Sequence, residues 1–264
     1  IFHGGRQTEE WIIGQQVWAP SAIPCPVKKA LPHEMTTQEV EEMVEKFGDA
    51  ALRAKKAGFD GVQIHGGHGY LVCEFASAYS NKRIDKYGGN LVNRMRFPVE
   101  IIQNIRKKCG EDFGIDYKIS GEECAPGGTN IEDTKAMAIM LEEAGIHSLN
   151  VSVGVYETWY MQVPPSVMGH GWIADYAAEI KKVVEIPVTT VGRVNDPLVA
   201  EGIIRSGKAD ACYMGRASLA DPHMPEKALN GRFEDIIQCM ACLQGCTSKI
   251  DSGCHGQCTL NPRT

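Results

Sequence analysis

Short apolar runs alternate with longer segments of helical periodicity along most of the chain. Runs rich in β-branched residues predict strands, and apolar residues that recur every 3.6 positions predict helices. The predicted strands span residues 1–2, 61–65, 115–120, 148–153, 187–191 and 211–214. The predicted helices span residues 37–57, 91–108, 131–144, 173–184, 197–206 and 222–229. This alternation indicates a parallel α/β sheet, because each parallel return needs a crossover.

The residues that follow the predicted strands favour a closed barrel over an open sheet. No Gly-x-Gly-x-x-Gly motif follows the first strand, which weighs against a dinucleotide-binding open sheet. Polar or glycine residues follow most strands, as on the active face of a barrel: His65, Ser120, Gly192-Arg193 and Gly215-Arg216. The predicted fold is therefore a (β/α)8 TIM barrel. Such a barrel has eight strands, so we expect its first two strand-helix units to lie upstream of Ile1.

Composition indicates a globular protein and argues against two classes of partner. The 264 residues, 43% of them hydrophobic, suffice for one large domain with a small appendage. A formal net charge of −6 provides no basic stripe for nucleic acid. No apolar run approaches the roughly 18 residues that a membrane span needs. We therefore expect neither nucleic acid nor a membrane as a partner.

Cysteines are concentrated at the C-terminal end of the chain. The series reads Cys239-x2-Cys242-x3-Cys246-x11-Cys258. Four such thiolates can surround a [4Fe-4S] cluster, although they can also hold zinc. Cys254 lies inside the last spacer and is a rival ligand to Cys258, which the following Asn261-Pro262 favours. Ten cysteines without a signal-peptide pattern fit a reducing cytoplasm better than a disulfide framework.

A polar motif follows the strand predicted at residues 61–65. His65 and His68 are three residues apart and can direct both imidazoles at one oxygen atom, while Tyr70 offers a phenolic proton. This trio suits the polarisation of a carbonyl group. Metal binding by the two histidines, or hydrogen bonds that satisfy loop backbone, account for the same spacing, so the spacing alone leaves all three interpretations open.

Several motifs stand in order along nearly the whole chain. They are His3-Gly4-Gly5-Arg6-Gln7, the segment from Gly58 to Leu71, Asn81-Lys82-Arg83, Tyr87-Gly88-Gly89, the segment from Asn93 to Phe97, Gly192-Arg193, Gly215-Arg216 and the terminal cysteines. Together they resemble the Old Yellow Enzyme family. The resemblance is to its iron-sulfur branch, which includes 2,4-dienoyl-CoA reductase, 2-enoate reductase, bile-acid-type NADH:flavin oxidoreductases and trimethylamine dehydrogenase.

The resemblance implies FMN bound across the C-terminal mouth of the barrel. The family places the phosphate against backbone after the last two strands, which corresponds here to Gly192, Arg193, Gly215 and Arg216. Lys118 stands where the family usually has Arg, beside the flavin, and keeps the positive charge without the planar fork.

The resemblance also implies roles for the polar motif. His65 and His68 would bind the substrate carbonyl and stabilise developing enolate charge, and Tyr70 would donate the proton. Tyr156 would face the substrate, at a position where the dienoyl-CoA reductase branch has His.

The implied activity is the FMN-dependent reduction of the C=C bond of an enoate, enone or enoyl-CoA. Electrons would come from NAD(P)H through the [4Fe-4S] cluster, after a second flavin, FAD, in C-terminal domains of a parent chain. We expect a catalytic barrel at residues 1–230 and a cluster-binding segment at residues 231–264. Two alternatives are an amine dehydrogenase of the trimethylamine dehydrogenase type, which carries Tyr in place of His65, and a non-catalytic zinc-binding module. The sequence leaves open whether the protein forms a homo-oligomer.

Overall fold

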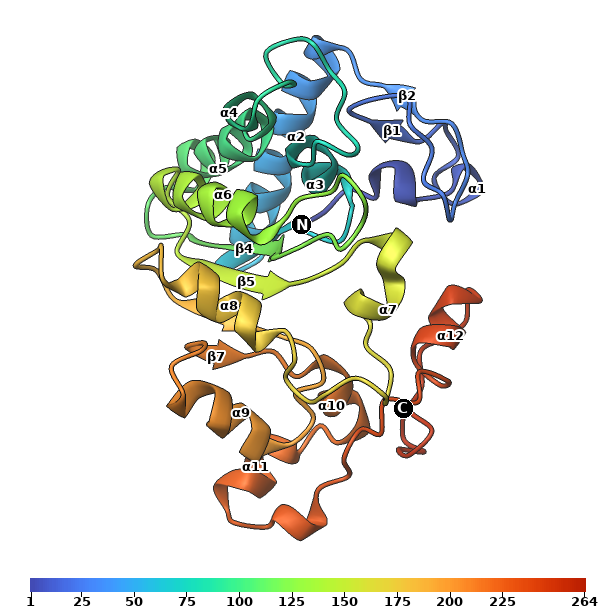
Figure 1. Ribbon diagram of the computed structural model, residues 1–264, viewed down its shortest axis with the longest axis vertical. Helices are drawn as coiled ribbons and strands as arrows, with labels where there is room; N and C mark the ends of the chain where they lie inside the picture. Colours follow the sequence, from blue (N-terminus) through green and yellow to red (C-terminus); the bar gives the residue numbers. More distant parts are fainter.

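The computed structural model describes residues 1–264 and has a parallel β-sheet at its centre. Five strands lie side by side in sequence order. They are β3 (Gly61–Gly66), β4 (Gly114–Ser120), β5 (Ser148–Ser152), β6 (Val188–Thr190) and β7 (Ala211–Cys212). A separate two-stranded parallel sheet pairs β1 (Trp18–Ala19) with β2 (His33–Glu34), in an excursion of the chain that precedes the first long helix (Figure 1).

Helices connect the strands of the large sheet, as parallel pairing requires. The α-helices are α1 (Glu10–Ile13), α2 (Thr37–Lys56), α3 (Leu71–Ala76), α4 (Leu91–Arg94), α5 (Arg96–Cys109), α6 (Ile131–Glu143), α7 (Trp159–Gln162), α8 (Ala174–Lys181), α9 (Pro197–Arg205), α10 (Gly215–Ala220), α11 (Met224–Leu229) and α12 (Thr247–Asp251). Three 3-10 turns are η1 (Gly5–Gln7), η2 (Tyr156–Thr158) and η3 (Phe233–Asp235). None of the helices combines the length and apolar character that crossing a membrane requires.

Helix α2 shows how local sequence sets an element. Thr36 and Glu39 form a capping box, in which the Thr36 hydroxyl accepts from the Glu39 N–H (3.2 Å) and the Glu39 carboxylate accepts from the Thr36 N–H (2.7 Å). The buried side chains of the helix recur at helical spacing: Val40, Met43, Val44, Phe47 and Ala51. This stripe packs α2 against α5 over the sheet.

The two faces of the sheet carry different side chains. On β4, Ile115, Tyr117 and Ile119 are buried in the core shared with the covering helices, and the alternate residues Asp116 and Lys118 lie on the opposite face. The strand register sets four polar residues side by side on β3, β4, β5 and β6: His65, Lys118, Asn150 and Thr189. This row of polar groups is the foundation of the candidate site.

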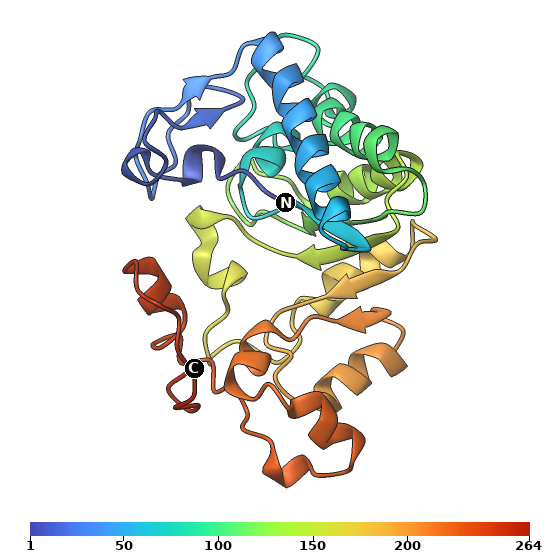
Figure 2. The same ribbon diagram turned by 180° about the vertical axis from the view of Figure 1, so that it is seen from behind.

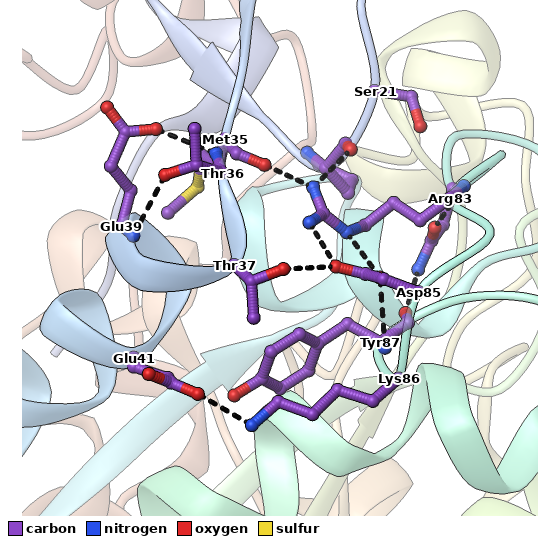
Figure 3. A network of polar contacts seen from close by, with 12 residues as sticks. Ser21, Met35, Thr36, Thr37, Glu39, Glu41, Arg83, Asp85, Lys86 and Tyr87 are labelled. Atoms are coloured by element: carbon purple, nitrogen blue, oxygen red, sulfur yellow. Dashed lines mark hydrogen bonds and ion pairs between the residues drawn. The ribbon is translucent and has the colours of Figure 1, made fainter.

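A buried arginine joins the N-terminal excursion to the core (Figure 3). Arg83 donates to the carbonyl oxygens of Pro20 (3.0 Å) and Met35, and it forms two hydrogen bonds to Asp85, at 3.0 and 2.5 Å. Thr37, at the start of α2, also donates to Asp85 (2.8 Å). The Asn81-Lys82-Arg83 motif therefore connects the excursion, α2 and the loop after α3.

The C-terminal segment, residues 231–264, is attached by a few side chains. Asn195 donates to the carbonyl oxygen of Cys239 (2.5 Å), and the buried Asn261 donates to that of Leu219 in α10 (3.1 Å). Figures 1 and 2 show α12 beyond α7, on the side of the molecule away from α2 and α5.

The structure confirms most of the predicted elements and corrects two of them. Residues 1–2 are not a strand, although Ile1 pairs with β3 through its amine, which donates to Gln63 O (2.6 Å), and its carbonyl, which accepts from His65 N (3.0 Å). The helix predicted over 91–108 is two helices that meet at Met95. Pro98 explains the break, because it has no N–H to donate to the Arg94 carbonyl.

Candidate active site

The turn between β3 and α3 brings the two histidines together. Position 66 requires glycine, because a Cβ atom would come within 2.1 Å of the Tyr117 ring. His68 adopts a left-handed backbone (φ 62°), and its N–H donates to Ser120 Oγ (2.9 Å). The ring centroids of His65 and His68 consequently lie 5.0 Å apart.

Both imidazoles are neutral near pH 7. Burial and then the charge of Lys118 lower the pKa of His65 to about 4, and the same causes hold the pKa of His68 well below its ordinary value. Nε2 of His68 lies 2.7 Å from Ser152 Oγ, and Nδ1 of His65 is buried without a partner in the chain. A neutral imidazole has one N–H donor, so each ring can donate one hydrogen bond to a carbonyl oxygen.

Two tyrosines extend the histidine pair. The Tyr70 ring meets the His65 ring edge-on with centroids 4.8 Å apart, and its hydroxyl lies 3.1 Å from the hydroxyl of Tyr156. Burial, followed by the contact with Tyr70, raises the pKa of Tyr156. The structure thus brings together the four residues that the sequence assigns to catalysis and substrate binding, from the end of β3 and from the loops after β3 and β5.

A cavity of about 580 Å³ lies beside this cluster. It is lined by residues that include His68, Lys118, Ser152, Gly192, Arg193, Gly215, Arg216, Cys239 and Cys246. Its volume falls within the roughly 300–1,000 Å³ of small-molecule and cofactor sites. All the predicted cofactor-binding residues line it, whereas His65, Tyr70 and Tyr156 do not.

Lys118 enters the cavity from β4. Its ammonium group donates to Oδ1 of the fully buried Asn150 (2.7 Å), and Nδ2 of Asn150 donates to Thr189 Oγ1 (2.8 Å). Burial lowers the pKa of Lys118 to about 8, and the carboxylate of Asp116 offsets only part of this effect. Lys118 is therefore mainly protonated at neutral pH, and one of its three N–H donors is committed to Asn150.

Backbone amides form another wall of the cavity. The N–H groups of Gly192 and Arg193 make no hydrogen bond within the chain, and Gly192 has a left-handed φ of 97°. The N–H groups of Gly215 and Arg216 belong to the first turn of α10, where no intrahelical acceptor exists. Unpaired amides of this kind suit a phosphate group.

The two arginine side chains have other partners. The Arg193 guanidinium donates to the carbonyl oxygens of Ser166 (2.7 Å) and Met168, and that of Arg216 donates to Pro164 O (2.9 Å). Both therefore hold the loop after α7 in place. The structure favours the backbone at these positions, rather than the guanidinium groups, as the anion-binding element.

Sequence reasoning did not identify two residues of this site, Asn150 and Ser152. Both are buried polar side chains on β5 that bond to Lys118 and His68 respectively. Their signal was the alternation Ser148-Leu149-Asn150-Val151-Ser152, which places polar groups on one face of a strand. The partners across the sheet cannot be assigned without the register.

The four predicted metal-binding cysteines surround a second, small cavity of about 20 Å³. Cys239, Cys242, Cys246 and Cys258 all line it, whereas Cys254 is exposed and does not. Cys239, Cys246 and Arg216 border both cavities. Cys258, rather than Cys254, therefore lines the small cavity together with the other three cysteines.

The cysteine loop carries backbone strain. Ala241 and Leu243 both adopt left-handed φ values, of 54° and 63°, which are unfavourable for residues with a Cβ atom. A hydrogen bond with Thr259 (3.2 Å) and backbone N–H groups lower the pKa of Cys242, which favours the thiolate. No group of three or more Cys, His, Asp or Glu side chains is arranged so that it could hold a metal ion.

Comparison with known proteins identifies the family. The sequence profile described as "NADH:flavin oxidoreductase / NADH oxidase family" matches residues 1–235. The chain is 47% identical over 264 residues to NADH oxidase of Thermoanaerobacter brockii, and it is 38% identical over 277 residues to cinnamate reductase of Clostridium sporogenes. These alignments cover 99% and 98% of this chain and 41% of each relative.

A solved structure agrees with this assignment. The complex of 2-naphthoyl-CoA reductase with 2-naphthoyl-CoA superposes with a TM-score of 0.95 at 33% identity, and covers 100% of this chain and 42% of that one. The chain thus spans less than half the length of these relatives. The predicted barrel type is confirmed, while the two units expected upstream of Ile1 stay a prediction. The chain belongs to the NADH:flavin oxidoreductase / NADH oxidase family, whose members are Old Yellow Enzyme-type flavoproteins.

Proposed function

We propose that this protein is an FMN-dependent ene-reductase, which reduces the C=C bond of an α,β-unsaturated carbonyl compound with electrons from NAD(P)H. The observation that carries the proposal is the cavity of about 580 Å³, which gathers a neutral His68, the Lys118 ammonium and the free amides of Gly192 and Arg193. Relatives named cinnamate reductase and 2-naphthoyl-CoA reductase support an unsaturated carboxylate or thioester as the substrate class.

The residues of the cavity fit FMN. The unpaired amides of Gly192 and Arg193, with those of Gly215 and Arg216, would hold its phosphate. The remaining N–H donors of Lys118 would hold the flavin ring and favour its anionic reduced form. When bound, FMN supplies hydride to the β-carbon of the alkene.

The chain itself provides the electrophilic and acidic groups. His65 and His68 donate one hydrogen bond each to the substrate carbonyl oxygen, and these bonds strengthen as negative charge develops there. Tyr70 protonates the α-carbon, and Tyr156 borders the substrate beside it. Neutral rings suit this role because they donate without adding a charge that the buried site would destabilise.

We further propose that residues 231–264 bind a [4Fe-4S] cluster through Cys239, Cys242, Cys246 and Cys258, next to an FMN-binding unit at residues 1–230. Support comes from the shared cavity of these four thiols and from the strained loop that carries three of them. A bound cluster would carry single electrons toward the larger cavity, which Cys239 and Cys246 also border. In this proposal NAD(P)H and FAD bind outside residues 1–264, in a cytoplasmic setting.

The test follows the oxidative half-reaction alone. Anaerobically purified holoprotein is reduced with dithionite and mixed with a panel of enoates, enones and acyl-CoA thioesters, and flavin reoxidation is recorded. Tyr70→Phe should slow reoxidation by about 10²-fold and change its solvent isotope effect, while Tyr160→Phe, at an exposed tyrosine, should not. Flavin reduction by an amine, with no reoxidation by any alkene, would support an amine dehydrogenase instead. Colourless protein with stoichiometric zinc would refute both.

A further inference from the structure

The 3-10 turn η1 lies buried between the two loops that carry the tyrosine pair. Arg6 and Gln7 are each 2% exposed, although they are polar and close to the start of the chain. On one side of them is the loop from β3 to α3, with His68 and Tyr70, and on the other is η2, which begins at Tyr156. The proposed mechanism assigns these two residues no role.

Gln7 bridges the two loops through its side-chain amide. Its Nε2 donates to the His68 carbonyl oxygen (2.8 Å), and its Oε1 accepts from the Tyr156 N–H (3.4 Å). Gly69 leaves room for this amide, since a Cβ atom there would come within 2.5 Å of Gln7 Oε1, and its φ of 76° also favours glycine. The bridge thus joins the backbone two residues before Tyr70 to the backbone of Tyr156.

Arg6 makes a second bridge between the same loops. Its backbone N–H donates to the carboxylate of Glu74 (2.8 Å), which lies one helical turn after Tyr70 in α3. Its guanidinium donates to the carboxylate of Glu157 (2.9 Å), the neighbour of Tyr156. Gly5 allows the approach, because a Cβ atom at that position would lie 2.2 Å from Glu74 Oε1.

We propose that Arg6 and Gln7 are positioning residues, which hold Tyr156 against Tyr70 so that the two hydroxyls stay in contact during proton delivery. The inference rests on the proposed ene-reductase function. Both bridges flank the contact of 3.1 Å between the phenolic oxygens. Since η2 has only three residues, its own backbone does little to fix Tyr156. The bridges add to the anchor that Thr158 provides, whose hydroxyl donates to the Glu123 carbonyl oxygen (2.8 Å).

The buried charges are poorly arranged for stability alone. Arg6 Nε, Glu74 Oε2 and Glu157 Oε2 are buried without any hydrogen-bond partner. Burial raises the pKa of Glu74 well above its ordinary value, although Arg6 opposes this shift. An ion pair that leaves such atoms unsatisfied is weak evidence for a stabilising role. A role in positioning the two tyrosines accounts better for these buried charges.

The first test is a double-mutant cycle between Gln7→Leu and Tyr156→Phe. Gln7→Leu keeps the side-chain size and removes both hydrogen bonds. We expect it to slow alkene-driven flavin reoxidation by about tenfold while leaving flavin reduction by dithionite unchanged. In the Tyr156→Phe background the same substitution should have no further effect, because Gln7 acts through Tyr156. Effects that multiply in the double variant would overturn the proposal.

A second measurement does not depend on turnover. Ultraviolet titration of the tyrosines, with Tyr156→Phe as reference, isolates the ionisation of Tyr156. Gln7→Leu should bring the raised pKa of Tyr156 down toward its ordinary value as the loops separate. Such a shift in a protein that reduces no alkene would refute the ene-reductase function but keep the positioning role. An unchanged titration would overturn that role.

The role of Arg6 is tested with variants that keep the local charge balanced. Arg6→Met alone leaves Glu74 and Glu157 uncompensated and can prevent folding, so the informative variants are Arg6→Lys and the pair Arg6→Met with Glu157→Gln. The paired variant should slow reoxidation severalfold, and Arg6→Lys should recover part of the rate. Lys28→Met, which removes the partly exposed ion pair with Glu9, is the control. Equal rates in the paired variant and wild type would refute a role for Arg6.

Discussion

The two sides of the large cavity are held in different ways. On the substrate side, His68, Tyr70 and Tyr156 rest on hydrogen bonds to Ser120, Ser152 and one another, above a continuous core of buried side chains. On the cysteine side, residues 231–264 are largely exposed, and only Ala241, Gly245 and Asn261 are buried. The chain's own packing holds the substrate side in place, whereas on the cysteine side the proposed cluster would supply the hold that few buried side chains provide.

Backbone conformation on the two sides supports this contrast. The left-handed φ of His68 is compensated by three hydrogen bonds, from its N–H, at its carbonyl oxygen and at its Nε2. Ala241 and Leu243 have similar φ values in a loop with one buried residue between positions 239 and 243. Strained backbone persists only where its surroundings enforce it, and metal-cysteine bonds would do so here.

The largest expected effect comes from Cys242→Ser. This variant should lose the cluster and nearly all NAD(P)H-driven turnover, because one of four ligands is gone, while dithionite-driven alkene reduction continues. Iron analysis and visible absorbance measure the loss of the cluster, and assays driven by NAD(P)H and by dithionite measure the two activities. Limited proteolysis should then cut within residues 231–264 and leave the sheet domain intact.

Cys254→Ser is the matched control for that variant. Cys254 belongs to the same segment but is exposed and lies outside the cysteine cavity. Iron content and turnover should stay at wild-type values. Iron loss in Cys254→Ser, with iron retained in a Cys258→Ser variant, would exchange the two residues in the ligand set.

The next effect is smaller and confined to the substrate side. His68→Ala removes a neutral donor to the developing enolate and should lower the rate of alkene-driven flavin reoxidation by about 10²–10³-fold, as for other oxyanion donors. Flavin reduction and iron content should not change. His223→Ala, at an exposed histidine paired with Glu226, is the control. Equal losses in both half-reactions would contradict the assigned role of His68.

The sequence predicts the fold where an element has a clear local pattern. Strands β3 to β7 were predictable from short runs rich in β-branched residues that alternate with helical segments, and helices such as α2 from apolar residues at helical spacing. The short β1 and β2 were not, because they stand outside this alternation and no crossover helix separates them. Nor was the end of α4, where a missing N–H at Pro98 outweighs the continuing apolar pattern.

The candidate site was predictable where motifs are local in the sequence. His65, His68 and Tyr70 lie within six residues of one another, and the structure does bring them together. The contribution of Gln7 was not predictable, because its partners lie 61 and 149 residues away. Such contacts depend on the register of the folded sheet, which composition and periodicity do not encode.

Acid should weaken the attachment of the N-terminal excursion to the core through the network of Arg83 and Asp85 (Figure 3). Burial raises the pKa of Asp85, but hydrogen bonds from Arg83 and Thr37 outweigh it and hold the pKa at about 2. A depressed carboxyl pKa stabilises the fold above the unfolded value of 3.8 and loses this contribution as the pH falls toward about 2. The loss should be about 2 kcal/mol in the free energy of unfolding.

Chemical denaturation at a series of acidic pH values measures that loss. Asp85→Asn should be less stable than wild type at neutral pH and should show a shallower decline with acid. Asp175→Asn, which removes an exposed carboxylate paired with Lys208, should follow the wild-type profile. An Asp85→Asn profile parallel to that of wild type would show that this network does not titrate with folding.

The smallest effect tests whether Lys118 connects the two sides of the cavity through its charge. Because burial lowers the pKa of Lys118 to about 8, its positive charge is present at neutral pH and is lost as the pH rises through about 8. Stabilisation of anionic reduced flavin should decline over the same range, so flavin reduction should slow severalfold in wild type. Arginine stays charged over this pH range, so flavin reduction by Lys118→Arg should keep a constant rate as the pH rises through about 8. A decline shared by both proteins would place the titrating group elsewhere, and the cysteine thiols would be the next residues to examine, since they border the same cavity.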